Sequence, residues 1–393
     1  MDVGARCANF AHSNSISKGG IFFVATVPGF FRFFQGQLRK LKELGDITIV
    51  ASPGETLTEI AEKEGVECLG VSIPRRIAIV KDIWALWSLF CVFCSRRPQM
   101  VHGNTPKGAL LSMVAAFFAR VPVRVFMCHG LCNSTERGLK RRIIMMMERV
   151  TCFFSTHIIA VSHGLKNELV ESKFASADKV SLILNGCVSG VDLKEFMPGD
   201  KASEKIKLGW GGAFVFGFVG RIVRDKGIEE LVDAFSRLSR EYSEVRLILL
   251  GKIEGENAIS NSALQSIQSS PSICYLGFQK NLTSFYQAMD CLVFPSYREG
   301  FGMVVAEAGA SGVPCIVSDI SGCNEIIREG ENGTIIPPRD ADALYRAMKR
   351  FYEERKTTLP GMASRSRGLI ASRYEQRAVW DATLEMYRNL TDK

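Results

Sequence analysis

Short runs of β-branched and aromatic residues alternate with amphipathic stretches along the whole chain, and this alternation constrains the fold more than any other feature. The runs include "IFFVATV" (21–27) and "VRVFMC" (123–128) in the first half, and "FVFGFVG" (214–220) and "CLVFPS" (291–296) in the second. Stretches with helical periodicity, such as 226–242, lie between them. Strand and helix in alternation predict parallel sheets with helices on both faces, so we expect an α/β fold.

The length of 393 residues favours more than one domain. A segment rich in Pro, Gly and Lys, without apolar periodicity, occupies 197–212 and is the best hinge candidate. We therefore expect an N-terminal domain at 1–197, joined by a C-terminal helix at 374–393, and a C-terminal domain at 198–373. Two doubly wound, Rossmann-like domains of this kind would face each other across a cleft, and ligands would bind at the carboxyl ends of the strands.

The basic residues are unevenly distributed. Residues 1–190 hold 23 Lys and Arg against 14 Asp and Glu, whereas residues 191–393 hold 26 against 27. A positive surface on one half attracts anions, such as lipid headgroups or phosphorylated substrates. We expect no nucleic-acid partner.

Twelve cysteines are scattered through the chain, mostly in apolar surroundings, which is typical of buried thiols in a reducing compartment. Cys91 and Cys94 lie in an apolar run, where a metal-binding thiolate is unfavourable, and no acidic cluster for a divalent metal stands out. The start of the chain does not resemble a signal peptide, and the longest apolar run (83–94) has only 12 residues, too few to cross a bilayer. We expect a cytoplasmic protein without a metal or other cofactor.

The segment "YREGFGMVVAEAGASG" (297–312) follows the strand-like run 291–296 and reads as a loop and then a helix that begins near Gly302 or Met303. The first N–H groups of a helix have no internal partner and favour a phosphate-bearing ligand. Glu299 would lie at the rim of that site and Glu307 about one turn inside it, where carboxylates suit sugar or ribose hydroxyls. Taken alone, the segment would also suit an ordinary turn followed by a solvated helix.

A second segment, "FVGRIVRDKGIEELVDAF" (218–235), places cations at the end of another predicted strand. The strand ends at Gly220, Arg221 follows, and Lys226 precedes the next helix. Fixed cations there would neutralise a diphosphate and stabilise the charge that builds up on a departing one. Both segments lie at strand-to-helix turns in one half of the chain, which favours a shared site.

With "GRIVRDKG" followed by "EGFGMVVAE", the chain resembles the retaining GT-B glycosyltransferases of family 4. The resemblance covers nearly the whole chain, because "VHGNTPKG" (101–108), "CHGL" (128–131) and "SGCNEIIREGENG" (321–333) follow in the expected order. Within that family the chain is most similar to bacterial enzymes that build capsule, O-antigen or other lipid-linked glycans.

The resemblance implies a hexosyltransferase (EC 2.4) that takes a nucleotide-sugar, with UDP favoured, as its donor substrate and retains the anomeric configuration without a metal. Arg221 and Lys226 would bind the donor diphosphate, Glu299 would contact sugar hydroxyls, and Glu307 would hold the ribose. The N-terminal domain would be the acceptor side, and the C-terminal domain would bind the nucleotide-sugar donor. His129 would face the donor sugar from the first half. The backbone of Gly29, Gly220, Phe301, Gly302, Met303 and Val304 would line the donor site.

Three other functions remain open from the residues. A sugar-nucleotide epimerase on the same fold would bind the same donor, but no additional acid and base set can be assigned to it. A dinucleotide-dependent dehydrogenase is disfavoured because "VPGFFRFFQG" (27–36) lacks G-x-G-x-x-G. A non-catalytic nucleotide-sugar-binding protein would keep the same fold.

Several features of the first half have two interpretations. Trp84, Trp87 and Phe90 lie in an apolar helix near the basic segments "RR", "SRR" and "RGLKRR", which begin at 75, 95 and 137. This face would either rest on anionic lipid at the inner face of the plasma membrane or belong to the core. His102, in "VHGN", suits a structural hydrogen bond as well as a substrate contact. Lys107 opens a helix, where a cation is unfavourable, so a bound substrate anion would explain it.

Overall fold

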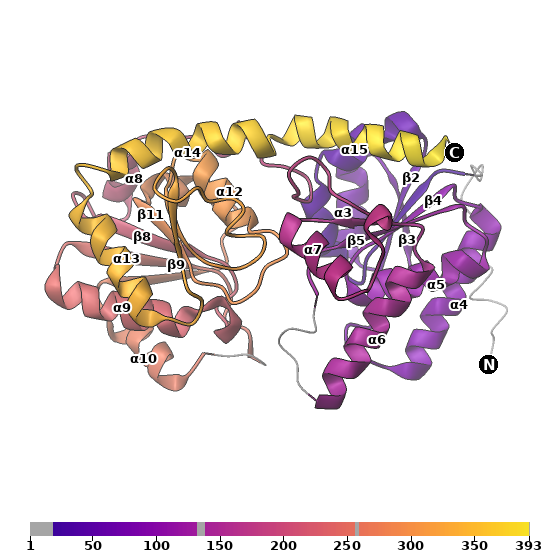
Figure 1. Ribbon diagram of the computed structural model, residues 1–393, viewed down its shortest axis with the longest axis horizontal. Coiled ribbons are helices and arrows are strands. Elements are labelled where there is room, and N and C mark those ends of the chain that lie inside the picture. Colours follow the sequence, from indigo (N-terminus) through magenta and orange to yellow (C-terminus); the bar gives the residue numbers. More distant parts are fainter. Residues whose placement is uncertain (1–18, 132–137, 256–258, 393) are drawn as a thin grey trace. The chain divides into compact units, whose positions relative to one another are not determined.

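The computed structural model describes residues 19–131, 138–255 and 259–392, and the chain forms two compact units. Unit 1 comprises the chain up to Ala160, residues Leu169–Ser181 and the chain from Trp380 on. Unit 2 comprises Val161–Glu168 and Leu182–Val379. In Figure 1 the strands of each unit form their own sheet, with helices around it.

Seven parallel strands form the sheet of unit 1, in the order β3-β2-β1-β4-β5-β6-β7. Their bounds are Ile21–Val24 (β1), Ile47–Ala51 (β2), Glu67–Gly70 (β3), Met100–Gly103 (β4), Val123–Cys128 (β5), His157–Ala160 (β6) and Val180–Ser181 (β7). Every residue of β1, β2 and β4 is buried. Central strands of a parallel sheet are covered on both faces, which is why they appear in the sequence as nearly unbroken apolar runs.

The helical segments of unit 1 include three long helices that pack in sequence order, α4 against α5 and α5 against α6. The bounds are Pro28–Phe34 (η1), Gln37–Leu41 (α2), Lys42–Leu44 (η2), Glu55–Glu64 (α3), Ile79–Arg96 (α4), Pro106–Phe118 (α5), Gly138–Phe154 (α6) and Ala177–Lys179 (η4); His163–Glu171 (α7) passes from unit 2 into unit 1. Helix α4 buries Ala85, Leu89, Val92 and Phe93, a spacing that gives a helix one apolar inner face.

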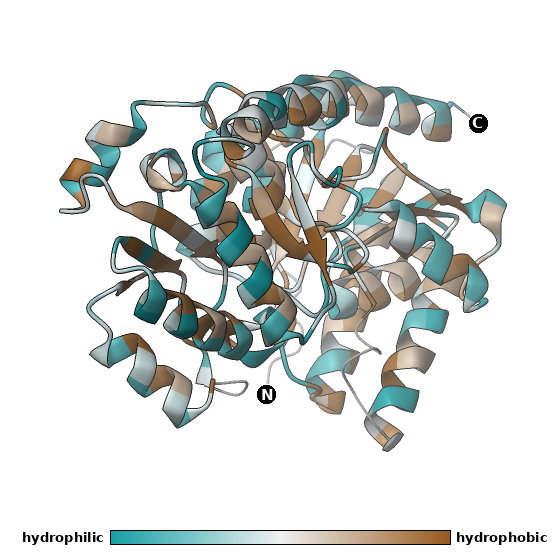
Figure 2. Cartoon of the chain, turned by 60° about the vertical axis from the view of Figure 1, so that its left-hand side comes forward, coloured by the Kyte–Doolittle hydropathy of each residue, from teal (hydrophilic) through white to brown (hydrophobic). Residues whose placement is uncertain are grey.

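Six parallel strands form the sheet of unit 2, in the order β10-β9-β8-β11-β12-β13. Their bounds are Phe214–Val219 (β8), Val245–Leu250 (β9), Ile273–Gly277 (β10), Cys291–Phe294 (β11), Cys315–Ser318 (β12) and Gly333–Ile336 (β13). Figure 2 shows these strands in the brown of hydrophobic residues, behind helices that alternate between teal and brown turns. The core of unit 2 therefore lies between its sheet and the apolar sides of its helices.

The helical segments of unit 2 are Lys201–Lys207 (α8), Arg224–Lys226 (η5), Ile228–Glu241 (α9), Asn261–Ser269 (α10), Thr283–Ala288 (α11), Met303–Ala310 (α12), Ala341–Glu353 (α13) and Leu359–Tyr374 (α14). Helix α9 is the clearest amphipathic one. It buries Ile228, Leu231, Val232, Phe235 and Leu238, which recur at the spacing of one helical face. None of the described helices combines the length and apolar character that crossing a bilayer requires.

The segment at 197–212, predicted as a hinge, lies inside unit 2 and holds a helix. The Asp200 side chain accepts a hydrogen bond from the N–H of Ser203 and so caps α8, a contact that a Pro-, Gly- and Lys-rich composition does not reveal. The chain passes from unit 1 to unit 2 earlier, between Ser181 and Leu182.

The last helix, Gln376–Thr391 (α15), returns to unit 1 from Trp380 on. Gln37 Nε2 donates a hydrogen bond of 3.0 Å to Thr383 Oγ1. The Trp380 ring fills the space beside Gly36, where a Cβ atom would meet it at 2.3 Å. These contacts attach the end of the chain to α2 and to Gly36, the residue that precedes it.

Each sheet reverses its strand order once, between β1 and β4 in unit 1 and between β8 and β11 in unit 2. In doubly wound sheets, ligands bind outside the carboxyl ends of the strands at such a reversal. The loops that follow β1, β4 and β5 in unit 1, and β8 and β11 in unit 2, are therefore where functional residues are expected.

Candidate active site

The loops after β8 and β11 are joined at the strand reversal of unit 2. Gly227, which precedes α9, has φ of +68°, and a Cβ atom there would lie 2.1 Å from the carbonyl oxygen of Pro295. Tyr297 N–H donates a hydrogen bond of 2.9 Å to the carbonyl oxygen of Asp225. Only glycine satisfies both the φ angle and the close approach, so the sequence "DKG" brings Lys226 beside the β11 loop.

Lys226 and Glu299 meet at this junction. Lys226 Nζ donates a hydrogen bond to Glu299 Oε1, and the two side chains are only 13% and 15% exposed. The ammonium group also lies 5.7 Å from the centre of the Phe294 ring. A shielded ion pair of this kind interacts more strongly than one in open water, and it presents both a cation and hydrogen-bond acceptors to a ligand.

Arg221 follows β8, the strand that also precedes Lys226, but its side chain pairs with a residue other than Glu299. It follows Gly220, and its Nη1 atom is 3.1 Å from Glu254 Oε2, with both side chains 50% exposed. Within the described residues Arg221 pairs with Glu254 rather than with Glu299. An exposed pair contributes little to stability, so the guanidinium group can exchange Glu254 for a phosphate at low cost.

Helix α12 begins four residues after Glu299, and its N-cap residue, Gly302, has no side chain that could cap the amino end. Gly302 N–H donates a hydrogen bond of 2.8 Å to the carbonyl oxygen of Gly322, which holds the loop against the residues that follow β12. Gly322 has φ of +78°, and a Cβ atom there would meet Gly300 O at 2.3 Å. The predicted helix start at Gly302 or Met303 is confirmed, and its N–H groups favour an anion.

The side chain of Phe301 is a core residue rather than a ligand group. It is buried and packs edge to face against Tyr374, with ring centres 5.1 Å apart. Of the predicted donor-site residues from Phe301 to Val304, Phe301 therefore has only its backbone to offer to a ligand.

Glu307 lies one turn into α12 and accepts a hydrogen bond of 2.8 Å from the Tyr286 hydroxyl. Burial raises the pKa of Glu307 to about 7, although the hydrogen bond from Tyr286 acts in the opposite direction. Tyr286 comes from α11 and was not predicted, because one tyrosine in a short helix carries no sequence signal. The carboxyl group of Glu307 is thus held in one orientation and has a second oxygen for a ligand.

In unit 1, His129 follows β5 and contacts residues from two other loops. Its Nε2 atom is 3.3 Å from Asn104 Oδ1, after β4, and its ring meets that of Phe30 edge on, with centres 4.8 Å apart. Burial lowers the pKa of His129 to about 4, so the imidazole is neutral at pH 7. Gly29 is exposed next to Phe30 in η1, and none of the atoms in the described ranges would lie within 4 Å of a Cβ atom there.

His102 is a core residue. It has no exposed surface, and its ring lies 4.6 Å from Phe23 and 5.7 Å from Tyr387, measured between ring centres. Of the two interpretations of His102, the structural one therefore applies. Asn104, two residues on, was not predicted, although its place just after a strand at the reversal point could have indicated it.

The sequence-predicted residues thus form two groups. Unit 2 brings together Lys226, Glu299, the start of α12 and Glu307, with Gly220 and Arg221 at the neighbouring strand end. Unit 1 brings the Gly29 loop and His129 together through Phe30. In the described ranges, no three His, Cys, Asp or Glu side chains gather in a way that could hold a metal ion.

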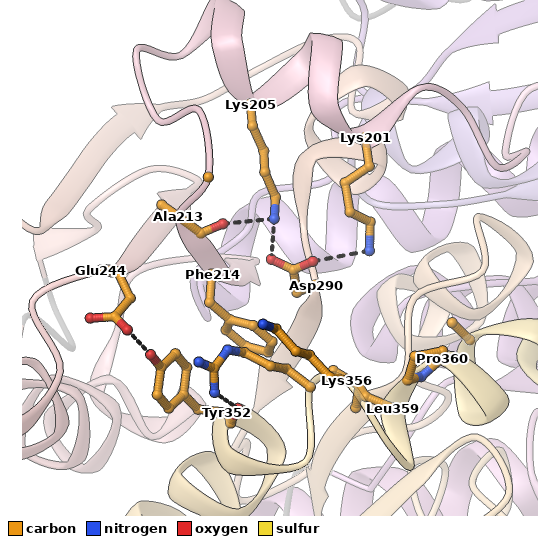
Figure 3. A pocket seen from close by; sticks show the side chains of 13 residues that line it. Lys201, Lys205, Ala213, Phe214, Glu244, Asp290, Tyr352, Lys356, Leu359 and Pro360 are labelled. Carbon is orange, nitrogen blue, oxygen red and sulfur yellow. Dashed lines mark hydrogen bonds and ion pairs between the residues drawn. The ribbon is translucent and has the colours of Figure 1, made fainter.

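A cavity of about 410 Å³ lies at the opposite, amino edge of the unit 2 sheet (Figure 3). Lys205 Nζ donates a hydrogen bond of 2.7 Å to the carbonyl oxygen of Ala213 and another to Asp290, and Lys201 lies 3.2 Å from Asp290. None of the predicted site residues is among the 13 that line it. Its charged groups attach α8 to the starts of β8 and β11, which gives them a structural role.

Two family models match the chain, one after the other. Residues 29–188 match the model described as Glycosyltransferase Family 4, and residues 200–361 match the model described as Glycosyl transferases group 1. The first match covers the loops that carry Gly29, Asn104 and His129. The second covers both loops of the Lys226–Glu299 pair and all of α12.

Curated relatives align over most of the chain. The capsular polysaccharide biosynthesis glycosyltransferase CapM of Staphylococcus aureus is 29% identical over 369 residues, which is 93% of this chain and 96% of the relative. A UDP-Gal:α-D-GlcNAc-diphosphoundecaprenol α-1,3-galactosyltransferase of Escherichia coli is 26% identical over 79% of this chain and 81% of its own.

Solved structures share the fold at lower identity. HepE of Anabaena, in complex with UDP-glucose, superimposes with a TM-score of 0.77 at 19% identity, over 94% of this chain and 99% of its own. Sucrose-phosphate synthase of Thermosynechococcus elongatus gives a TM-score of 0.76 at 19% identity, over 95% and 99%. The similarity extends over both sheets.

Proposed function

We propose that this protein, which belongs to the GT-B glycosyltransferases and carries a family 4 domain followed by a group 1 domain, transfers a hexose from a UDP-sugar to a lipid-linked glycan acceptor. The observation that carries the proposal is the shielded Lys226–Glu299 pair beside the uncapped start of α12. That arrangement offers positive charge to a diphosphate and carboxylate oxygens to sugar hydroxyls within one loop junction.

The names of relatives support the choice of substrates. The solved HepE structure contains UDP-glucose, and the relative from Escherichia coli is named for transfer from UDP-Gal to a diphosphoundecaprenol-linked sugar. A Campylobacter jejuni relative, 23% identical over 91% of this chain, is also named for a diphospho-undecaprenol acceptor. CapM is named for capsular polysaccharide biosynthesis, so we place this protein in the synthesis of a surface polysaccharide.

In the proposed reaction the bond between C1 of the sugar and the β-phosphate oxygen breaks. A bond forms between C1 and the acceptor oxygen, and the acceptor proton passes to the departing phosphate. Lys226, Arg221 and the N–H groups at the start of α12 stabilise the negative charge that develops on that phosphate. The acceptor attacks from the face that the phosphate leaves, so the anomeric configuration is retained, and no metal is needed to neutralise the charge.

The carboxylates orient the donor rather than attack it. Glu299, fixed by Lys226, accepts hydrogen bonds from sugar hydroxyls. Glu307, fixed by Tyr286, accepts them from the ribose. Such buried carboxylates select strongly for a ligand whose hydroxyl groups donate hydrogen bonds to them. A ligand without those hydroxyl groups would leave the carboxylates without hydrogen-bond partners.

The acceptor side rests on the membrane surface in this proposal. Ile79, Val80, Ile83, Trp84 and Trp87 of α4 are between 55% and 73% exposed, so the alternative that the tryptophans belong to the core does not hold. Helices that precede parallel strands begin at the carboxyl edge of the sheet, so the exposed start of α4 lies at the edge that carries His129.

Basic residues accompany this apolar surface. Arg75, Arg76 and Lys81 are exposed beside the start of α4, and Arg141 and Arg142 at the start of α6. Tryptophan and cations together suit the interface of an anionic bilayer, so we place the protein at the cytoplasmic face of the plasma membrane.

The test is incubation of the purified protein with a panel of labelled nucleotide-sugars, with and without a diphospholipid-linked sugar. We expect transfer from one UDP-sugar, with slow hydrolysis when no acceptor is present. Epimerised sugar in place of transfer would show the epimerase alternative. Silence with every donor would show a non-catalytic protein.

Lys226→Ala should lower kcat/KM by about 10²- to 10³-fold, the usual effect of removing one preorganised donor from a developing charge. Because the single change leaves Glu299 shielded and unpaired, the double variant Lys226→Ala/Glu299→Gln should recover stability but not activity. Lys349→Ala, which removes a lysine that pairs with Glu241 on the surface, is the matched control. Near-normal turnover in the Lys226 variant contradicts the proposed catalytic site.

A further inference from the structure

A second ion pair joins the loops after β8 and β11, beside the Lys226–Glu299 pair. Arg298 Nε lies 3.4 Å from Asp225 Oδ2. Asp225 is the residue before Lys226, and Arg298 is the residue before Glu299. The two pairs therefore have opposite polarity, because one loop contributes an acid and then a base, and the other contributes a base and then an acid.

Backbone contacts place Asp225 against the residues that precede Arg298. The carbonyl oxygen of Asp225 accepts a hydrogen bond of 2.9 Å from Tyr297 N–H, and the Ser296 hydroxyl oxygen lies 3.4 Å from it. Ser296 is completely buried, so this side of the junction is closed to water. Asp225 thus contacts three consecutive residues of the loop after β11, at 296, 297 and 298.

The alternation of charge favours one alignment of the two loops. In the observed alignment each cation faces an anion of the other loop. A shift of one residue would bring Lys226 opposite Arg298, where like charges repel each other. An arrangement that pairs its charges in one alignment and opposes them in the next selects the first, as charge patterns do between protein partners.

The Asp225–Arg298 pair balances the charge of the junction. The side chain of Arg298 is 36% exposed and that of Asp225 is 15% exposed, and a partly exposed pair contributes little to the free energy of unfolding. Asp225 Oδ1 is buried and has no hydrogen-bond partner in the described part of the chain. The two acids and two bases of the junction have no net charge, so the loss of either outer partner leaves an unbalanced charge next to the Lys226–Glu299 pair.

We infer that Asp225 and Arg298 are positioning residues that leave Lys226 and Glu299 to each other and to the donor. Arg298 neutralises Asp225, which would otherwise compete with Glu299 for Lys226 and repel the donor diphosphate. Asp225 in turn holds Arg298, which would otherwise compete with Lys226 for the carboxylate of Glu299. The inference deepens the proposed function and rests on it for the identity of the ligand.

Calorimetric titration with inorganic pyrophosphate at low salt reads the charge of the junction without any catalysed reaction. Arg298→Gln should bind pyrophosphate about threefold to tenfold more weakly than the parent protein, because an unbalanced carboxylate remains. Asp225→Asn should bind it about threefold more tightly, because an unbalanced guanidinium group remains. The double variant Asp225→Asn/Arg298→Gln should bind it as the parent does, because both charges are removed and both shapes are kept. Weaker binding in all three variants is the result of a pair that only supports the fold, and it overturns the inference.

Steady-state kinetics with the nucleotide-sugar that the parent uses give the second measurement. In Asp225→Asn the released Arg298 occupies Glu299, so kcat/KM should fall about tenfold even though pyrophosphate binds more tightly. A loss of folded protein cannot produce these opposite shifts in one variant. In the double variant kcat/KM should return to within about threefold of the parent value, because two residues that act as a pair are not additive. An unchanged kcat/KM in Asp225→Asn, or a double variant no better than the poorer single variant, overturns the inference.

Asp342 and Arg237 provide the matched control, because they form an ion pair of the same two residue types in unit 2, between α13 and α9. Arg237 lies in the third turn of α9, about 14 Å along the helix axis from its first residue, Ile228. Asp342→Asn and Arg237→Gln should change neither pyrophosphate binding nor kcat/KM, and equal shifts in these controls would overturn the inference.

The fate of the proposed function is read separately. A parent protein that shows the pyrophosphate pattern but uses no nucleotide-sugar contradicts the proposed function and supports the charge balance of the junction. A parent protein that transfers sugar while its variants lack the pattern supports the proposed function and overturns the inference.

Discussion

At the scale of single residues, Glu307 meets two opposing demands. Tyr286 holds its carboxyl group, which binds a ribose in the proposed function, yet burial raises the pKa of Glu307 to about 7. A folded-state pKa above the unfolded value contributes stability that is present below about pH 4.5 and is lost as the pH rises through about 7. Glu307→Gln should therefore be more stable than the parent at pH 8, but should bind UDP about tenfold more weakly because it loses a charged acceptor.

Urea unfolding at pH 5 and pH 8, together with calorimetric titration of UDP, measures both effects. Glu241→Gln, at the far end of α9 and exposed, controls for loss of charge in unit 2 and should leave UDP affinity unchanged. If Glu307→Gln binds UDP as the parent does, Glu307 does not hold the ribose. If the stability of Glu307→Gln falls with rising pH as steeply as that of the parent protein, the ionisation of Glu307 is not the source of this pH dependence.

Sequence reasoning at this scale succeeds where a side chain acts near its own strand end and fails where its partner is distant. The sequence predicts Lys226 and Glu299 in one site because each follows a strand of one sheet, and the structure brings their side chains into contact. Lys107 was interpreted through a substrate anion, but its ammonium group lies 2.7 Å from Asp82 and donates to the carbonyl oxygens of Pro74 and Arg76. Those partners come from a segment whose path the sequence alone does not define.

At the scale of secondary-structure elements, the β8–α9 connection determines where Lys226 lies. Gly227→Ala would place a methyl group against Pro295 in a backbone conformation that alanine disfavours. We expect it to destabilise unit 2 by about 2–4 kcal/mol and to lower transfer sharply, because the Lys226–Glu299 pair separates. Denaturant unfolding followed by a transfer assay on the folded fraction measures both.

Gly330→Ala separates the effect of backbone strain from the effect of the close approach between the two loops. Gly330 has φ of +74°, but in the part of the chain that the structure describes no atom would lie within 4 Å of an added Cβ atom. Its substitution should therefore cost only about 1 kcal/mol, from backbone strain, and should leave transfer intact. Equal losses in the two variants would show that the close approach of the two loops does not matter.

The elements themselves were largely predictable, because strand and helix periodicities are local. The runs at 21–27, 123–128, 214–220 and 291–296 contain β1, β5, β8 and β11. The segment at 197–212 was not, because Asp200 as a helix cap and Lys205 bonded to Asp290 outweigh a linker-like composition. Composition records what a segment contains but not which distant residue it meets.

At the scale of the whole molecule, the uneven charge and the exposed face of α4 predict association with anionic lipid. Apolar side chains that enter the bilayer interface gain the free energy of leaving water, and basic residues near an anionic surface add about 1 kcal/mol each. Cosedimentation with vesicles should show binding to phosphatidylglycerol but little to phosphatidylcholine alone, and it should weaken with added salt.

Trp84→Ser/Trp87→Ser should reduce vesicle binding by at least about tenfold, since each indole contributes on the order of 1.5 kcal/mol or more when it leaves water. Ile206→Ser is the matched control, because Ile206 is 66% exposed but lies on α8 of unit 2. The double variant should still transfer sugar to a short-chain, water-soluble acceptor, but it should lose activity on a long-chain acceptor with the same sugar that is embedded in vesicles. If the parent protein stays in solution with phosphatidylglycerol vesicles, or if the double variant binds them equally well, α4 does not dock on lipid. If the double variant loses activity on the soluble acceptor, the tryptophans support the fold or the site instead.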